Sequence, residues 1–431
     1  MAWFPASSLN DGVAKREVFA WAMYDFANSG YTTVVLTAVF NAYFVGAVAG
    51  KADWATLAWT LALGVSNAIV MLTMPSLGAF ADARGAKKKL LALATVGCVI
   101  GTSALAFVGT GDVALAFVAI VISNACYSYG DSLIAAFLPE LARRDSLGKV
   151  SGWGWSFGYF GGMLALGASL AYVIWAQGQG QSATQFVPVT MGITAAIYAL
   201  ACLVTFVWLR ERAVASAPQA GFRDALARLK RTWDEAARFR DFRLLLVCAL
   251  AYQAGISVVI ALAAVYAEQV LGFQQQQTMM LVFLVNIAAA LGAFAFGYWQ
   301  DRIGHRPALA VTLVGWIVMT VLAMLATTAA VFWVAAVIAG LCMGSSQSAG
   351  RAMAGLMAPP DRLAEFYGLW TFATRLSAII GPVTYGIVTW VTAGNHRLAI
   401  LSTALFFVLG LLVLRSIDVG RGARVAQGLP A

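Results

Sequence analysis

The strongest constraint on the fold is a succession of twelve long apolar runs. A helix needs roughly 20 apolar residues to cross the hydrocarbon core of a bilayer. Of the 431 residues, 61% are hydrophobic and only 11% are charged, a balance that a water-soluble domain could not cover with polar surface. We therefore expect an all-α membrane protein of twelve transmembrane helices, at about 18–45, 55–80, 89–109, 112–138, 150–176, 187–209, 243–268, 277–300, 307–327, 330–357, 364–392 and 397–414.

The positive charges indicate how these helices are oriented. Most of the 28 lysines and arginines fall at the N-terminus, in the loops that follow even-numbered spans, and in the C-terminal tail, whereas the opposite loops hold only Lys51 and Arg397. Positively charged loops stay in the cytoplasm. We expect a protein of the cell inner membrane with both termini in the cytoplasm. This distribution explains the net charge of +9 without a nucleic-acid partner.

No pattern of catalytic or metal-binding residues is present in the sequence. The five cysteines occur singly in apolar runs and form no C-x-x-C pair, so neither a disulfide framework nor a metal site is expected. There is also no Walker loop and no pairing of a nucleophile with a base. The sequence favours a secondary transporter without cofactors over an enzyme.

A charged interval separates two groups of six spans. We expect an N-terminal half at 1–209, a linker at 210–242 and a C-terminal half with a short tail at 243–431. Within 221–243, apolar residues recur every three to four positions between charged ones, which predicts a basic amphipathic helix on the inner leaflet. A calmodulin-like partner site is the alternative for such a pattern.

The two groups of spans resemble each other in sequence. Gly130-Asp131 in the fourth span corresponds to Gly350-Arg351 in the tenth, at a shift of 220 residues. Tyr24-Asp25 in the first span corresponds more weakly to Tyr252-Gln253 in the seventh. Two six-helix halves in parallel repeat are the layout of major facilitator transporters.

A loop motif of the form GxxxDxxGxK/R occurs after the second span and again after the eighth. Glycine permits a tight turn and close helix contact, and the aspartate can sit near a helix N-terminus or a neighbouring arginine and so stabilise one conformation. A generic charged turn is the alternative. The duplicated motif resembles the signature loop of the major facilitator superfamily, and its residues are the candidate gating loops: Gly78, Asp82, Gly85 and Lys87, then Gly297, Asp301, Arg302, Gly304 and Arg306.

Further motifs occur in both groups of spans: WAMYDFANSGY at 21–31, LPEL at 138–141, GYFGG at 158–162, QSAGR at 347–351, EFYG at 365–368 and GP at 381–382. They resemble one branch of that superfamily, the UMF1 group, which is related to fungal vacuolar amino-acid effluxers linked to autophagy. The resemblance implies export of amino acids or similar small polar solutes.

Ionisable residues inside spans are costly and usually face the interior of the bundle. They and the polar amides nearby are the candidates for substrate binding or coupling: Asp25, Asn28, Asn124, Asp131, Gln253, Gln347, Arg351 and Arg375. The alternative is that the amides only join helices and the charges are structural. Trp21, by contrast, lies at a span end and is expected to anchor the helix at the membrane interface.

Two hypotheses follow for these charges. Asp131 pairs with Arg351 or with Arg375 when the cytoplasmic side is closed. Asp25, whose counterpart is the uncharged Gln253, either carries a coupling proton or is a permanently ionised structural group. The partners expected are a small-molecule substrate, protons if Asp25 couples, and membrane lipids, with the protein acting as a monomer. A lipid flippase on the same fold and a membrane sensor or scaffold remain alternatives.

Overall fold

The computed structural model describes residues 5–430 except 51, 53, 213–237 and 274. The described residues form helices and connecting turns, and the only β-type contact among them is an isolated bridge between Leu9 and Ala142. The predicted amphipathic helix at 221–243 falls, as far as residue 237, outside the described residues. The predicted all-α fold is confirmed.

The first half contains six long helical segments. The first runs from α1 (Lys15–Tyr31) through a π-helical stretch (Thr32–Ala38), α2 (Phe40–Tyr43) and a second π-helical stretch (Phe44–Val48). The others are α3 (Ala55–Arg84), α4 (Lys87–Ala104), α5 (Val113–Ala135) with the short α6 (Leu138–Leu141), α7 (Leu147–Gly178) and α8 (Ala183–Trp208).

The second half contains six more long helices and a short terminal one. They are α10 (Arg240–Leu271), α11 (Gln275–Ile303), α12 (His305–Leu325), α13 (Ala329–Leu356), α14 (Leu363–Val391), α15 (His396–Leu414) and α16 (Val419–Ala426).

Eleven of the helical segments are long and apolar enough to cross a membrane by length and composition. The remaining long helix, α14, has 29 residues but carries Arg375 and several hydroxyl-bearing side chains in its interior. Such a helix can span when its polar face is turned toward other helices rather than lipid. The contacts of Arg375 described below show that it is. The predicted twelve-span architecture is therefore confirmed.

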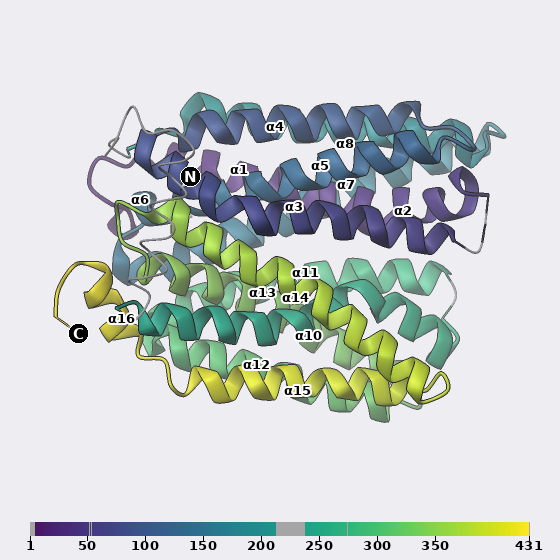
Figure 1. The fold of residues 1–431 in the computed structure, drawn as a ribbon. Helices are drawn as coiled ribbons and strands as arrows, with labels where there is room; N and C mark the ends of the chain where they lie inside the picture. The colour runs from purple at the N-terminus through teal and green to yellow at the C-terminus, as the bar shows by residue number, and fades with distance from the viewer. Residues whose placement is uncertain (1–4, 51, 53, 213–237, 274, 431) are drawn as a thin grey trace.

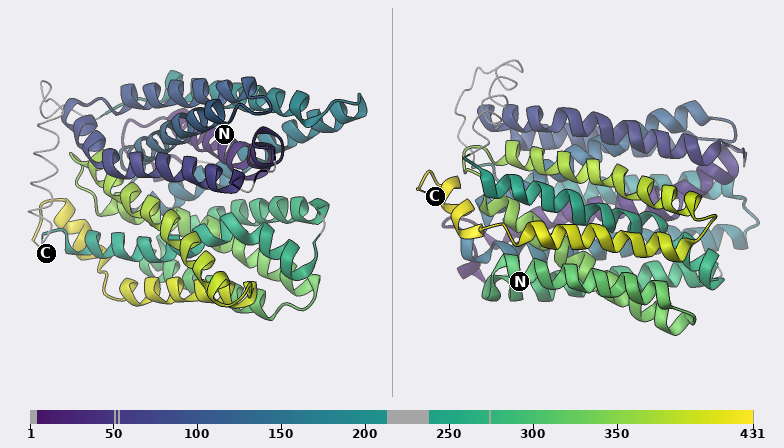
Figure 2. Two further views of the ribbon diagram at one scale, coloured as in Figure 1. Left: turned by 45° about the vertical axis from the view of Figure 1, so that its right-hand side comes forward. Right: turned by 60° about the horizontal axis from the view of Figure 1, so that its bottom comes forward.

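The two halves lie side by side and approach each other most closely at the end that holds both termini, as Figure 1 and Figure 2 show. We call this end the terminal face. Toward the opposite end, the far face, α3 and α14 diverge (Figure 1). The contacts at the terminal face are close because glycines replace side chains there. A Cβ added to Gly78 would overlap the backbone of Ala364, and a Cβ added to Gly297 would lie 3.1 Å from Gly152 Cα.

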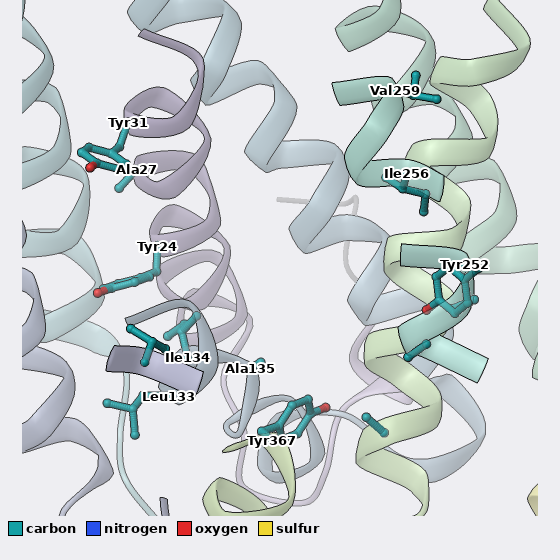
Figure 3. Close-up of a cluster of buried hydrophobic side chains, with 14 of the residues drawn as sticks. Tyr24, Ala27, Tyr31, Leu133, Ile134, Ala135, Tyr252, Ile256, Val259 and Tyr367 are labelled. Carbon is teal, nitrogen blue, oxygen red and sulfur yellow. The ribbon is translucent and has the colours of Figure 1, made fainter. Parts of the chain in front are cut away.

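The internal repeat is visible in the packing of one tyrosine in each half. Tyr24 on α1 and Tyr252 on α10 stand at corresponding places in the interior, each followed by apolar residues on later turns (Figure 3). The hydroxyl of Tyr24 lies over Gly130, and the hydroxyl of Tyr252 lies over Gly350. Each glycine is needed, because a side chain at position 130 would collide with Tyr24, and one at position 350 would collide with the Tyr252 hydroxyl and the Trp370 ring.

Candidate transport site

A buried ion pair joins the first half to the second near the terminal face. Arg351 on α13 donates from Nη1 to Asp25 Oδ2 on α1 at 2.8 Å, and their side chains are only 6% and 7% exposed. Arg351 also donates from Nε to Ser151 Oγ at 3.1 Å and from Nη2 to the Ser151 carbonyl at 2.9 Å. Three guanidinium nitrogens thus bind the first half, which offsets the cost of burying both charges.

Two tryptophans of the first half enclose the guanidinium of Arg351. Its carbon lies 4.7 Å from the centre of the Trp21 ring and 5.2 Å from that of Trp155, distances at which the negative ring faces attract a cation. Trp21 is fully buried, and its Nε1 donates to the Ile134 carbonyl at 2.8 Å. The expectation that Trp21 is an interface anchor is therefore wrong, because the ring packs inside the bundle.

A second ion pair joins the halves in a looser geometry. Arg375 Nη2 on α14 lies 3.6 Å from Asp131 Oδ2 on α5, and the two side chains are 17% and 36% exposed. The Arg375 guanidinium also lies 5.7 Å from the Tyr127 ring centre, and its Nε is buried without a hydrogen-bond partner. Of the two partners expected for Asp131, the structure shows Arg375, while Arg351 binds Asp25 instead.

The polar amides divide between the two halves. In the second half, Gln253 and Gln347 satisfy each other, with amide contacts of 2.7 Å and 3.3 Å. In the first half, Asn28 Oδ1 accepts from the Tyr198 hydroxyl at 3.0 Å, but its Nδ2 is buried without a partner. Asn124 donates to Ser66 Oγ at 2.5 Å and leaves its own Oδ1 unpaired. Unpaired buried polar atoms are costly and mark places where a bound molecule can supply the missing partner.

Each signature-loop aspartate binds the N-terminal backbone of a helix in the opposite half. Asp82, at the end of α3, accepts from the Glu365 backbone N–H on α14 at 2.8 Å. Asp301, at the end of α11, accepts from the backbone N–H groups of Gly148 and Lys149 on α7 at 3.0 Å and 2.9 Å. A carboxylate at a helix N-terminus is stabilised by the unpaired N–H groups and the helix dipole. Both loops therefore hold the terminal face together.

The basic and glycine positions of the two loops differ more. Lys87 is buried and pairs with Glu140, whereas Arg306 is exposed and donates from Nη2 to the Arg415 carbonyl at 2.7 Å. Arg302 is exposed as well. Gly85 and Gly304 both have positive φ, +58° and +92°, which is the left-handed region that glycine adopts without strain.

Sequence reasoning missed the surroundings of Arg351. Ser151, Trp21 and Trp155 form most of its environment, yet none was a candidate for binding. The place of Trp21 at a span end predicts an interface anchor, and a serine and a tryptophan in an apolar run carry no distinguishing signal. No cluster of His, Cys, Asp or Glu suited to a metal ion occurs among the described residues, and the five cysteines are free.

Comparison with known proteins identifies the family. The profile described as "Vacuole effluxer Atg22 like" matches residues 45–427. An uncharacterized MFS-type transporter of Bacillus subtilis, YxiO, is 25% identical over 415 residues, covering 95% of this chain and 96% of that protein. Autophagy-related protein 22 of Saccharomyces cerevisiae is 22% identical over 362 residues, 72% of this chain and 67% of that protein.

Solved structures show the same architecture at low sequence identity. The human organic anion transporter MFSD10 aligns with a TM-score of 0.73 at 17% identity, covering 93% of this chain and 99% of that one. The major facilitator transporter FucP in its outward conformation aligns with a TM-score of 0.71 at 16% identity, covering 94% and 98%. With the profile match over most of its length, the chain belongs to the Atg22-like vacuole effluxer family of major facilitator transporters.

Proposed function

We propose that this protein is a secondary transporter of a small polar solute bearing charges of both signs, an amino acid or a similar molecule, and that Asp131 and Arg375 bind it. The observation that carries the proposal is the loose, partly exposed ion pair that these residues form between the halves. At 3.6 Å, with an unpaired guanidinium Nε, this pair retains binding capacity that the buried Asp25–Arg351 pair has already used.

The charges match the two ends of a zwitterion. Arg375 can accept a carboxylate in the bidentate geometry that guanidinium favours, and Asp131 can accept an ammonium group. In the first half, Asn124 Oδ1 is buried without a partner and offers an acceptor for the rest of the solute, while the Asn28 amide interacts with Asp131 and can orient that carboxylate. Export is the direction that the family description supports, since its members are described as effluxers.

Alternating access accounts for the shape of the molecule. We place the terminal face on the cytoplasmic side of the cell membrane, because the basic loops lie at this face. The structure is therefore closed toward the cytoplasm. Opening the inside requires the halves to rock about the site, as in other transporters built from two repeats. The Asp25–Arg351 pair and the Asp82 and Asp301 contacts would then separate, because each joins the two halves.

Asp25 is the proposed coupling residue in this cycle. In the closed state Arg351 neutralises it at 2.8 Å. When the inside opens, Asp25 loses that partner, and uptake of a proton would then compensate its charge. Asp25→Asn should in that case abolish accumulation driven by a proton gradient and retain solute exchange. Loss of exchange together with folding would instead assign Asp25 a structural role.

Transport in proteoliposomes tests the proposed function. A thermal-shift screen against amino acids, sugars, nucleosides and organic anions first selects solutes, and counterflow of the labelled solute then measures exchange. We expect zwitterions to raise the melting temperature and to exchange, and we expect Asp131→Asn and Arg375→Gln each to abolish exchange. Asp11→Asn is the matched control, because Asp11 forms a comparably loose but exposed pair with Arg143 at 3.5 Å.

Two results would contradict the proposal. Exchange at the wild-type rate in both site variants would exclude Asp131 and Arg375 as solute ligands. Scrambling of labelled phospholipid without exchange of any polar solute would assign the protein to the flippases.

A further inference from the structure

The C-terminal helix α16 lies across the terminal face and binds both halves of the protein. It follows α15 after a short turn and sits beside the first turn of α10 (Figure 1). We refer to residues 418–427 as the C-terminal strap. Asp418 begins the helix by accepting from the Arg421 backbone N–H at 2.9 Å, and Gly422, Val425 and Ala426 form its buried face.

The strap is fixed firmly to the second half. Arg421 donates from Nε and Nη2 to the two carboxylate oxygens of Asp241 on α10, at 2.7 Å and 2.8 Å, and the Asp418 backbone N–H donates to the same carboxylate at 2.9 Å. Asp241 is only 3% exposed. A bidentate arginine on a buried carboxylate is the strong form of an ion pair. Gly422 completes the attachment by packing directly on Met357 at the end of α13.

The contact of the strap with the first half is weaker. Arg144, in the turn that precedes α7, donates from Nη1 to the Ala423 carbonyl at 3.4 Å. With the Gln427 amide turned so that its oxygen faces Arg144, that oxygen also accepts from Arg144 Nε at 3.0 Å. Arg144 and Gln427 are both exposed. Arg144 lies four residues before Gly148, the position where Asp301 holds α7 against α11.

We propose that the strap is a brake on opening of the terminal face, with Arg144 as its releasable contact. The inference rests on the proposed function, in which the two halves rock against each other. When the halves separate at this face, the strap must stay with the half to which Arg421 binds it, so its bonds to Arg144 break. Those bonds are absent from the open state and therefore stabilise the closed one. Whatever displaces the strap from Arg144 would speed opening.

A distance measurement across the terminal face tests the brake without knowledge of the substrate. The full chain is first freed of its native cysteines. Spin labels are then attached at Lys89→Cys in the first half and at Arg302→Cys in the second, two exposed positions, and the distance between the labels reports the separation of the halves. We expect Arg144→Ala to increase the ratio of long to short distances about two- to fivefold, as loss of an exposed charged contact implies. Arg424→Ala is the matched control, since it removes an exposed arginine of α16 and leaves Arg144 in place.

A truncation after Ile417 provides the second variant and should increase the ratio at least as much as Arg144→Ala. An unchanged ratio in both the truncation and Arg144→Ala would overturn the brake, and so would an equal change in Arg424→Ala. Because the readout is a distance, a failed transport assay with a shifted ratio would overturn the proposed solute and leave the brake standing.

Discussion

The Asp25–Arg351 and Asp131–Arg375 ion pairs both connect the halves of this transporter, and they differ in almost every physical property. Asp25 and Arg351 meet at 2.8 Å, nearly without exposure, and the guanidinium has further bonds to Ser151. Asp131 and Arg375 lie 3.6 Å apart and remain partly exposed. The first pair uses its hydrogen-bonding capacity in contacts between the halves, and we propose that the second retains capacity for binding a solute.

The internal repeat makes this difference more informative. A shift of 220 residues relates Asp131 to Arg351, and the same shift relates Trp155 to Arg375. The contact between positions 131 and 375 is an ion pair, whereas its counterpart between 351 and 155 is a cation stacked on an indole. The contact between positions 131 and 375 is thus charged on both sides and partly exposed, whereas the equivalent contact between 351 and 155 joins a buried arginine to an indole.

The largest expected effect is loss of stability when the buried pair is broken from one side. Arg351→Met leaves the Asp25 carboxylate buried without its partner, which should cost about 3–5 kcal/mol. The double variant Asp25→Leu with Arg351→Met should recover most of that loss, because no charge remains unpaired. Thermal unfolding in detergent, followed by tryptophan fluorescence, measures the stability of the single and the double variant. A single variant as stable as wild type would show that the pair contributes nothing to closure.

An intermediate effect is expected at the two signature-loop aspartates. Asp82→Ala and Asp301→Ala each remove a carboxylate from the N-terminus of a helix in the opposite half, at a cost of about 0.5–2 kcal/mol. Because these contacts exist only while the terminal face is closed, the long-distance population between labels at positions 89 and 302 should rise in both variants. A rise in one alone would mean that the halves contribute unequally, contrary to their shared geometry.

The smallest expected effect is a difference in stability between variants of Tyr24 and Tyr252, the two tyrosines related by the internal repeat. The Tyr24 hydroxyl lies 2.9 Å from Thr95 Oγ1, whereas the Tyr252 hydroxyl is buried without a partner. Tyr24→Phe should therefore cost about 1 kcal/mol, and Tyr252→Phe should be neutral or slightly stabilising. Chemical or thermal unfolding of the two variants, measured under the same conditions, checks this difference in stability. Equal losses would indicate that the Tyr252 hydroxyl has a partner after all.

The sequence predicted the architecture well because spans, basic loops and the repeat are local patterns. Their spacing alone gave the twelve helices and the corresponding Gly130 and Gly350 positions. It predicted the charged site residues but not all of their partners. Asp25 and Arg351 are 326 residues apart, and their meeting depends on which helix faces touch when the halves close. The same dependence explains why buried Trp21 looked like an interface anchor.

Accessibility of the two carboxylate positions from the far face tests the distinction between the pairs most directly. Single cysteines replace Asp131 or Asp25 in a chain without its five native cysteines, and a membrane-impermeant thiol reagent is added from the far side. We expect the cysteine at position 131 to react, because Asp131 is partly exposed, and the cysteine at position 25 not to react, because Asp25 is buried. Equal reaction at both positions, or reaction at position 25 alone, would contradict the assignment of one pair to closure and the other to solute binding.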